Sequence, residues 1–152
     1  MSQPTFIFSP SGYTPVTAQV YDVAKPGANR PGQRILLVDD DPIVSNSLND
    51  VLVEEGFFVM LAKNGLEALQ VIKNSPVDLV LLDLNMPVKN GWDTLAEVRQ
   101  NDPVLPVIVL TARPHQLSNA MNAGASALME KPMDMLMLLQ TINGLLLSPK
   151  TP

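Results

Sequence analysis

Hydrophobic residues follow a changing pattern from residue 34 onward, in which short unbroken apolar runs alternate with longer amphipathic stretches. A short unbroken run is typical of a buried strand, whereas apolar positions that recur every three or four residues are typical of a helix packed on one face. The apolar runs predict strands at residues 34–39, 57–62, 78–83, 106–110 and 127–129. From residue 34 the chain is therefore expected to alternate between strands and helices.

The boundaries of the helices are marked by proline, glycine and asparagine. Pro42 occupies a first helical position, Gly56 ends the same helix, and Asn64 can cap the next one. Pro132 is predicted to begin the last helix, which runs to Leu147. The predicted helices cover residues 42–56, 65–73, 92–101, 116–123 and 132–147.

Five strand–helix units without hairpin signals predict an α/β fold with a parallel sheet and helices on both faces. Right-handed crossovers leave few topologies, and the flavodoxin-like order 2-1-3-4-5 is the common one for five units. We therefore predict a doubly wound, five-stranded parallel sheet. In such sheets the functional groups gather beyond the carboxyl ends of the strands.

The two ends of the chain differ from this pattern. Residues 1–33 hold five prolines, three glycines and only three charged residues, a composition that disfavours regular structure. We interpret residues 1–33 as a flexible Pro/Gly-rich tail, residues 34–147 as the domain and residues 148–152 as a disordered end. The tail nevertheless carries four of the six Phe and Tyr residues, so docking of these aromatic residues on a partner or on the domain is the alternative. They are Phe6, Phe8, Tyr13 and Tyr21.

Composition narrows the class of protein. Hydrophobic residues make up 46% and charged residues 16%, which favours a packed fold over disorder. A net charge of −5 without a Lys/Arg cluster argues against nucleic acid as a partner. The absence of cysteine excludes disulfides and thiolate chemistry. No apolar run is long enough to span a membrane and no signal peptide is recognisable, so a cytoplasmic location is expected.

Charged and hydroxyl side chains follow four of the five predicted strands. Asp39 ends the first strand and Asp40 follows it, and Asp83 ends the third strand. Thr111 follows the fourth strand, and Lys131 lies just after the fifth. Because parallel strands end at one edge of a sheet, these residues should converge in one crevice. Carboxylates brought close together repel each other unless a cation compensates their charge, and oxygen ligands favour Mg²⁺.

Four segments at these strand ends resemble the motifs of receiver domains in two-component response regulators. They are residues 36–42 (LLVDDDP), 82–87 (LDLNMP) with Gly91, 110–112 (LTA) and 130–132 (EKP). Each motif alone is weak, but together they occur in the right order, and the resemblance covers residues 34–147. It implies the fold predicted above, a signalling domain rather than an enzyme, and a cis peptide bond before Pro132.

The resemblance also implies a role for each residue. Asp83 would accept a phosphoryl group from a phosphohistidine of a histidine kinase or phosphotransfer protein, in a reaction that depends on Mg²⁺. Lys131 would pair with the phosphoryl oxygens and Thr111 would donate a hydrogen bond to them. The only catalysis expected is the domain's own phosphorylation and autodephosphorylation. The implied ligands of Mg²⁺ are Asp40, Asp83, the main-chain carbonyl of Asn85 and, through a water, Asp39.

Each of these residues also has a simpler interpretation. Asp41 precedes Pro42, so helix capping explains it better than a role in the site. Asp39 and Asp40 could merely favour the positive end of that helix. Lys131 could be a solvated lysine and Thr111 a loop hydroxyl. For any one of these residues the simpler interpretation is the better one. All of them except Asp41, taken together at one edge of the sheet, favour a phosphorylation site.

Two features depart from the family's pattern. Leu128 stands where most receivers have an aromatic residue, and the segment from Thr111 to Lys131 is short, which predicts a trimmed fourth helix or leading loop. These departures favour, as an alternative function, an adaptor with the receiver fold that signals without phosphorylation. A flavodoxin-like cofactor binder is a weaker alternative, because acids at the strand ends would repel a phosphate group.

The last part of the chain suggests a contact surface. Five of the eight methionines lie between residues 121 and 137, and the last helix has Asp134 as its one charge, so its apolar residues exceed what one packed face needs. We predict a homodimer or a downstream protein bound by the fourth helix, fifth strand and last helix. Because few residues follow Leu147, a single-domain regulator is expected. His115 is predicted to be a surface loop residue, and Arg113 and Asn85 could tune the phosphate lifetime.

Overall fold

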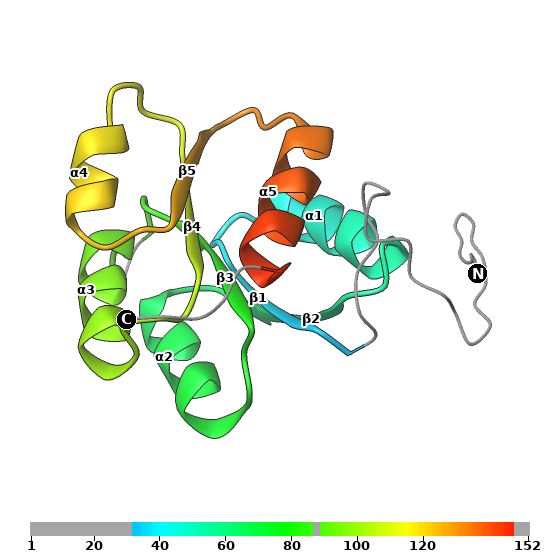
Figure 1. The fold of residues 1–152 in the computed structure, drawn as a ribbon, viewed down its shortest axis with the longest axis horizontal. Coiled ribbons are helices and arrows are strands. Elements are labelled where there is room, and N and C mark those ends of the chain that lie inside the picture. Colours follow the sequence, from blue (N-terminus) through cyan, green and yellow to red (C-terminus); the bar gives the residue numbers. More distant parts are fainter. Residues whose placement is uncertain (1–31, 87–88, 148–152) are drawn as a thin grey trace.

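The computed structural model of the protein describes residues 32–86 and 89–147, so most of the predicted tail and the predicted C-terminal end lie outside the described residues (Figure 1). The strands are β1 (Arg34–Val38), β2 (Phe58–Ala62), β3 (Leu79–Asp83), β4 (Val107–Thr111) and β5 (Ala127–Glu130). The helices are α1 (Pro42–Glu54), α2 (Gly65–Asn74), α3 (Gly91–Asn101), α4 (Leu117–Asn122) and α5 (Met135–Leu147).

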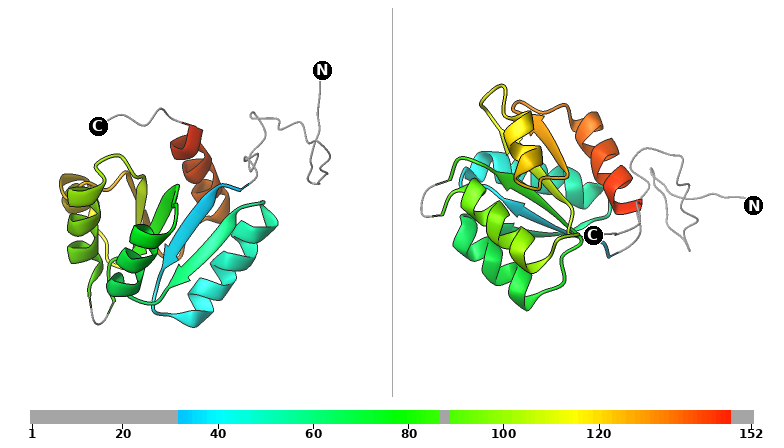
Figure 2. Two further views of the ribbon diagram at one scale, coloured as in Figure 1. Left: turned by 90° about the horizontal axis from the view of Figure 1, so that it is seen from below. Right: turned by 60° about the vertical axis from the view of Figure 1, so that its left-hand side comes forward.

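The five strands form one parallel sheet in the order β2-β1-β3-β4-β5. Helices α1 and α5 cover one face, and α2, α3 and α4 cover the other (Figures 1 and 2). The predicted fold class and strand order are therefore confirmed. Within residues 32–86 and 89–147, no helix has the length and apolarity needed to cross a membrane.

The central strands β1, β3 and β4 are mostly apolar because both of their faces are covered. Every residue of β3 and β4 is buried. In β1, Ile35 and Leu37 pack toward α1 and α5, whereas Leu36 and Val38 pack toward α2, α3 and α4. The unbroken apolar runs of the sequence therefore reflect a sheet with two hydrophobic layers, one on each side.

Side-chain caps fix where the helices begin. The Asp41 carboxylate accepts a hydrogen bond from the Ile43 N–H at 2.9 Å, and the Asn64 side chain accepts one from the Glu67 N–H at 2.9 Å. The capping roles predicted for Asp41 and Asn64 are confirmed. Asp41 thus belongs to α1, which leaves Asp39 and Asp40 at the end of β1.

The predicted start of the last helix is wrong by three residues. Helix α5 begins at Met135, not at Pro132, and the peptide bond between Lys131 and Pro132 is cis, as the resemblance implied. The carbonyl of Asp134 accepts a hydrogen bond from Leu138, and its carboxylate accepts one from Met137 at 3.2 Å. Asp134 is therefore the residue that caps α5, and the proline signal preceded the true helix start.

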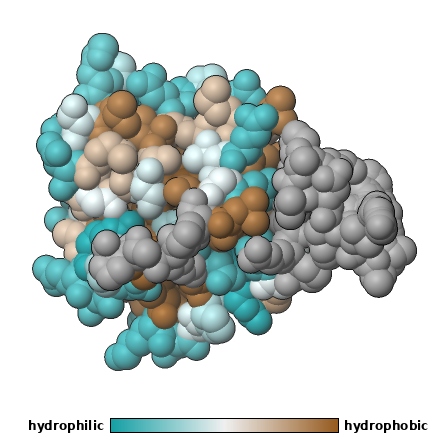
Figure 3. Space-filling model, in the orientation of Figure 1, coloured by the Kyte–Doolittle hydropathy of each residue, from teal (hydrophilic) through white to brown (hydrophobic). Residues whose placement is uncertain are grey.

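The methionine-rich region is divided between core and surface. Met129 is buried and Met135 is half-buried against the α1–α5 layer, whereas Met121 on α4 is 44% exposed and Met137 on α5 is 57% exposed. Figure 3 shows hydrophobic side chains at the surface over α4 and over the C-terminal half of α5. Some methionines of this region therefore belong to the core, and others lie at the surface.

Arg99 joins three segments around the α4 side of the sheet. Its guanidinium donates hydrogen bonds to the carbonyls of Gly124 at 2.7 Å, Leu105 at 2.7 Å and Asp102 at 3.1 Å. We expect Arg99→Met to lower the free energy of unfolding by about 2–3 kcal/mol, because carbonyls shielded from water lose their donors. Urea unfolding measures this, with the exposed neighbour Gln100→Met as the control. Equal losses in both variants would contradict the role given to Arg99.

Candidate functional site

The carboxyl ends of β1 and β3 bring three aspartates together. Val38 pairs with Leu82 in the parallel register, so the residues that follow β1 lie beside Asp83 at the end of β3. One carboxylate oxygen from each of Asp39, Asp40 and Asp83 lies within 4.8 Å of the others. Asp39 and Asp83 are buried, at 3% and 5% exposure, and Asp40 is exposed. The acidic cluster predicted from the strand ends is therefore present.

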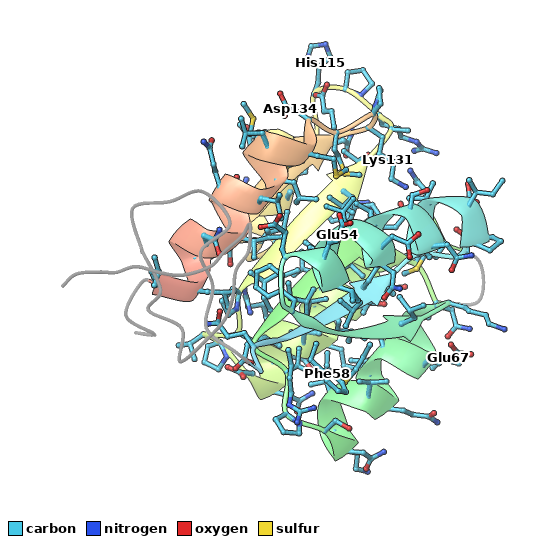
Figure 4. All side chains as sticks on the ribbon, turned by 90° about the vertical axis from the view of Figure 1, so that its right-hand side faces the viewer. Glu54, Phe58, Glu67, His115, Lys131 and Asp134 are labelled. Atoms are coloured by element: carbon cyan, nitrogen blue, oxygen red, sulfur yellow. The ribbon has the colours of Figure 1, made fainter. Side chains whose placement is uncertain are left out.

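Lys131 reaches this cluster from the end of β5. Its Nζ lies 3.0 Å from Asp39 Oδ2, with which it forms a hydrogen bond, and 3.6 Å from Asp83 Oδ1. Figure 4 shows Lys131 at the opposite end of the sheet from Phe58, the first residue of β2, as parallel strands require. The ammonium and the three carboxylates thus share one edge of the sheet.

The buried carboxyl of Asp83 is held in a balance of opposing effects. Burial raises its pKa above the ordinary value of 3.8, and the charges of Asp39 and Asp40 act in the same direction. The N–H of Asn85, which donates to Asp83 Oδ1 at 3.1 Å, and the Lys131 ammonium lower the pKa but do not cancel the rise. Burial, more than the neighbouring acids, therefore disfavours the charged form of Asp83.

For Lys131, burial shifts the pKa in the direction opposite to its effect on Asp83. Burial, the largest single effect, lowers its pKa, but the carboxylates of Asp39 and Asp83 together outweigh it and raise the pKa above 10.5. Lys131 is therefore a cation at neutral pH. With three carboxylates against one ammonium, the site has both the excess negative charge and the hard oxygen ligands that suit Mg²⁺.

Thr111 lies at the same edge of the sheet. Asp83 pairs with Leu110, so Thr111 is one residue further along β4, and it is 1% exposed. Its Oγ1 accepts a hydrogen bond from the N–H of Arg113 at 3.0 Å. A hydroxyl that accepts one bond can still donate its own proton, so Thr111 keeps a donor for a ligand at this edge.

The other residues singled out from the sequence take different positions. His115 is exposed in the loop after β4 with φ 61°, and Figure 4 shows it at the outer tip, so the prediction of a surface loop residue is confirmed. Arg113 and Asn85 are also exposed. Leu128 is half-buried against the α2–α4 layer, and α4 has only six residues, as expected from the short segment before Lys131.

Two parts of the site were not foreseen from the sequence. Asp39 was expected to act through a water, yet it also pairs directly with Lys131 and accepts a hydrogen bond from the N–H of Asp41 at 2.9 Å. Ser45, buried on α1, donates to the carbonyl of Asp39 at 3.3 Å. A polar residue on the buried side of a predicted helix was the available signal for Ser45.

Asp83→Asn is expected to raise the free energy of unfolding at neutral pH by about 1–2 kcal/mol without Mg²⁺, because a neutral amide replaces a buried charge. Folding raises the pKa of Asp83 above 3.8, so the folded protein takes up this proton first as the pH falls. The gain should therefore be largest above the raised pKa and disappear as the pH falls toward 3.8. Urea unfolding across this pH range with a chelator tests it.

The control is Asp50→Asn on the exposed side of α1, which should leave stability nearly unchanged at every pH. Added Mg²⁺ should stabilise the unsubstituted protein by mass action and have little effect on Asp83→Asn. Equal stabilisation of both proteins by Mg²⁺ would contradict a metal site at Asp83.

Comparisons with known proteins agree with this geometry. The family model described as "Response regulator receiver domain" matches residues 35–143. The transcriptional regulatory protein CpxR of Klebsiella pneumoniae is 46% identical over 101 residues, which cover 65% of this chain and 43% of that protein. The response regulator MprA of Mycobacterium sp. (strain KMS) is 39% identical over 115 residues, covering 74% and 50%. The chain thus spans about half the length of the curated relatives it matches.

Solved structures lead to the same family. A CheY-like receiver domain protein from Methanospirillum hungatei JF-1 is 33% identical with a TM-score of 0.71, and the match covers 76% of this chain and 94% of that one. The response regulator TrrA of Thermotoga maritima, solved in complex with Mg(2+)-BeF, is 34% identical with a TM-score of 0.70, covering 74% and 98%. Because the family match covers well over half of the chain, from β1 to α5, the chain belongs to the receiver domains of two-component response regulators.

Proposed function

We propose that the protein is a phosphorylation switch in which Asp83 accepts a phosphoryl group from a phosphohistidine. The donor would be a histidine kinase or a phosphotransfer protein, and the reaction would require Mg²⁺. The observation that carries this proposal is the set of three carboxylates within 4.8 Å of one another, with the Lys131 ammonium 3.6 Å from Asp83. Such a set can hold both a divalent cation and an incoming phosphoryl group.

In the proposed step, a carboxylate oxygen of Asp83 forms a bond to phosphorus while the bond from phosphorus to the imidazole nitrogen breaks. The nitrogen keeps the electron pair as it leaves. Phosphoryl transfer depends mainly on position and on compensation of the charge on the phosphoryl oxygens. The N–H of Asn85 and the Lys131 ammonium both approach Asp83 Oδ1, and so they orient the nucleophile.

The surrounding residues would divide the remaining work. Lys131 would pair with one phosphoryl oxygen and the Thr111 hydroxyl would donate a hydrogen bond to another. Mg²⁺ would be held by Asp40, Asp83 and the main-chain carbonyl of Asn85, with Asp39 bound through a water, and would supply positive charge to the phosphoryl oxygens. Because Asp39 already holds Lys131 at 3.0 Å, it keeps the ammonium in the site before the phosphoryl group arrives.

Incubation with acetyl phosphate or phosphoramidate and Mg²⁺, followed by intact-mass measurement, tests the proposal. The unsubstituted protein and the control Asp50→Asn should each gain one phosphate, whereas Asp83→Asn and samples with excess chelator should gain none. A phosphate that persists on Asp83→Asn would place the acceptor elsewhere. If no protein gains phosphate, the switch is rejected.

The second candidate function is a receiver-fold adaptor that signals without phosphorylation. The observation that favours it is Leu128, half-buried on β5 where most receivers have an aromatic residue. An adaptor would bind its partner equally well before and after treatment with the phosphodonor. The mass measurement separates the two functions, since an adaptor of this kind gains no phosphate.

The lifetime of the phosphorylated state would depend on residues around the path of the attacking water. Arg113 and Asn85 are exposed two residues beyond Thr111 and Asp83, respectively. The decay rate of phosphorylated Arg113→Ala, compared with that of the unsubstituted protein, tests whether Arg113 contributes. Equal decay rates would exclude such a contribution.

Output would occur by protein–protein contacts of this receiver domain, without nucleic acid as a ligand of the domain. The surface of α4, β5 and α5 is the proposed contact, either with a downstream protein or with a second copy. Light scattering coupled to size exclusion, with and without an acyl-phosphate mimic, tests for the dimer. A monomer in both states with no bound partner would count against this surface.

A further inference from the structure

Helix α5 has hydrophobic residues on its outer side as well as on its packed side. None of residues 135–147 is charged. Leu138, Ile142 and Leu146 are buried against the sheet, while Leu136, Met137 and Leu147 are 55%, 57% and 44% exposed. Figure 3 shows hydrophobic side chains at the surface over the C-terminal half of α5, whereas Leu136 and Met137 belong to its first turn. An uncharged outer face of this kind needs an explanation beyond packing of the domain.

The face is small for a stable contact between two separate molecules. A helix of 13 residues is about 20 Å long and about 10 Å wide, which gives a face of roughly 200 Å². Stable interfaces bury about 800 Å² on each partner. An occupant limited to this face would therefore need the advantage of being tethered to it.

The chain itself carries a segment of matching chemistry. Residues 1–21 contain no charged side chain and include Phe6, Phe8, Tyr13 and Tyr21. Aromatic side chains bury a large apolar area, and the Tyr hydroxyls can keep a polar partner at the edge of a contact. An uncharged aromatic segment thus complements an uncharged helix face, to which a charged partner would bind poorly.

The place where this segment joins the domain is favourable. β1 starts at the same end of the molecule where α5 ends, and the two lie side by side in the views of Figures 1 and 2. Residues 22–33 link this segment to β1, and a linker of that length has a root-mean-square span of about 20 Å, comparable to the length of α5. Tethering through such a linker corresponds to an effective concentration in the millimolar range.

We propose that residues 6–21 bind the outer face of α5 within the same molecule. The aromatic residues of the segment would cover Leu136, Met137 and Leu147. This contact would compete with any other protein for the α5 part of the output surface, so release of the segment would be required before a partner binds there. The proposal does not depend on phosphorylation of Asp83.

Paramagnetic relaxation in the 152-residue chain tests this contact. The chain has no cysteine, so Ser11→Cys gives a single site for a nitroxide label between Phe8 and Tyr13. The label should reduce the amide signals of α5 while sparing those of α2 and α3 on the opposite face of the sheet. Met137→Lys on α5 should restore the α5 signals, whereas the control Leu66→Lys, 52% exposed on α2, should leave them reduced.

A mixed sample identifies the molecule that supplies the segment. In it, ¹⁵N-labelled protein without the nitroxide is combined with unlabelled protein that carries it. No reduction of the α5 signals is expected in the mixture. Reduced α5 signals in the mixture would show that a second copy supplies the segment. Equally reduced signals over all helices in the first experiment would show that the segment has no preference for α5. Either result overturns the proposal.

Discussion

Lys131→Met is expected to slow the gain of phosphate at Asp83 by about 100-fold or more, the loss that follows removal of one charged or hydrogen-bonding group aimed at a transition state. Methionine keeps most of the side-chain length and removes only the cation. The ammonium lies 3.0 Å from Asp39 and 3.6 Å from Asp83. Within residues 32–86 and 89–147, no other lysine or arginine forms an ion pair with these two acids. The rate of mass gain from acetyl phosphate with saturating Mg²⁺ measures the effect.

The same substitution should change the pH dependence of the reaction. The Lys131 charge lowers the pKa of Asp83, so its removal leaves that pKa still further above 3.8. More of Asp83 is then protonated, and therefore inactive as a nucleophile, at mildly acidic pH. The rate of Lys131→Met should consequently rise with pH over a higher range than the rate of the unsubstituted protein.

Lys89→Met is the matched control, since Lys89 pairs at 2.9 Å with the partly exposed Glu97 on α3. A surface pair of this kind contributes little to stability, and its loss should leave the phosphorylation rate unchanged. Similar rates for Lys131→Met and the unsubstituted protein would remove Lys131 from the proposed mechanism. Similar losses in both lysine variants would indicate a general effect of net charge.

The pattern of apolar residues in the sequence was sufficient to predict the strands of the sheet and their order. Strands β1, β3 and β4 are buried on both faces, so their apolar runs are unbroken and easily recognised. The order of a doubly wound sheet then places the ends of β1 and β3 side by side. For this reason the proximity of Asp39, Asp40 and Asp83 could be predicted from the sequence alone.

Contacts between residues far apart in the sequence could not be predicted in the same way. Lys131 and Asp39 are 92 positions apart, and their direct hydrogen bond depends on side-chain geometry that no local pattern encodes. Helix α5 poses a similar difficulty, because it carries no charge and has apolar residues on more than one face. The positions of Leu138 in the core and Met137 at the surface follow from packing against the sheet and not from the spacing of hydrophobic residues.

The close approach of Gly91, at the start of α3, to the backbone at the end of β3 could not be predicted from the sequence either. Substitution of this glycine gives the second large expected effect. Gly91→Ala should lower the free energy of unfolding by about 2 kcal/mol, the usual cost of an atom added to a packed region. A Cβ at Gly91 would lie 2.5 Å from the carbonyl oxygen of Asp83 and 2.5 Å from the Cα of Leu84. Both are backbone atoms, so relief requires movement of the chain that carries Asp83.

Displacement of this backbone should also affect the proposed chemistry. The Gly91 N–H donates to the carbonyl of Leu84 at 3.1 Å, and the Leu84 N–H donates to Leu110 on β4 at 3.1 Å, so the end of β3 is held from both sides. A shift of about 1 Å in a reacting group can reduce a rate by about 100-fold. We therefore expect Gly91→Ala to gain phosphate much more slowly than the unsubstituted protein, even under conditions in which it is fully folded.

Gly144→Ala separates this steric effect from the general consequences of replacing glycine in a helix. A Cβ at Gly144 on α5 would meet no atom within 4 Å outside its own helical backbone. Alanine should therefore raise the free energy of unfolding by about 0.5–1 kcal/mol through its higher helix propensity, with no change in phosphorylation. Urea unfolding should show a loss of stability for Gly91→Ala and a gain for Gly144→Ala. The rate of mass gain should fall only for Gly91→Ala. If Gly91→Ala is as stable and as reactive as Gly144→Ala, then the close packing around Gly91 does not position Asp83.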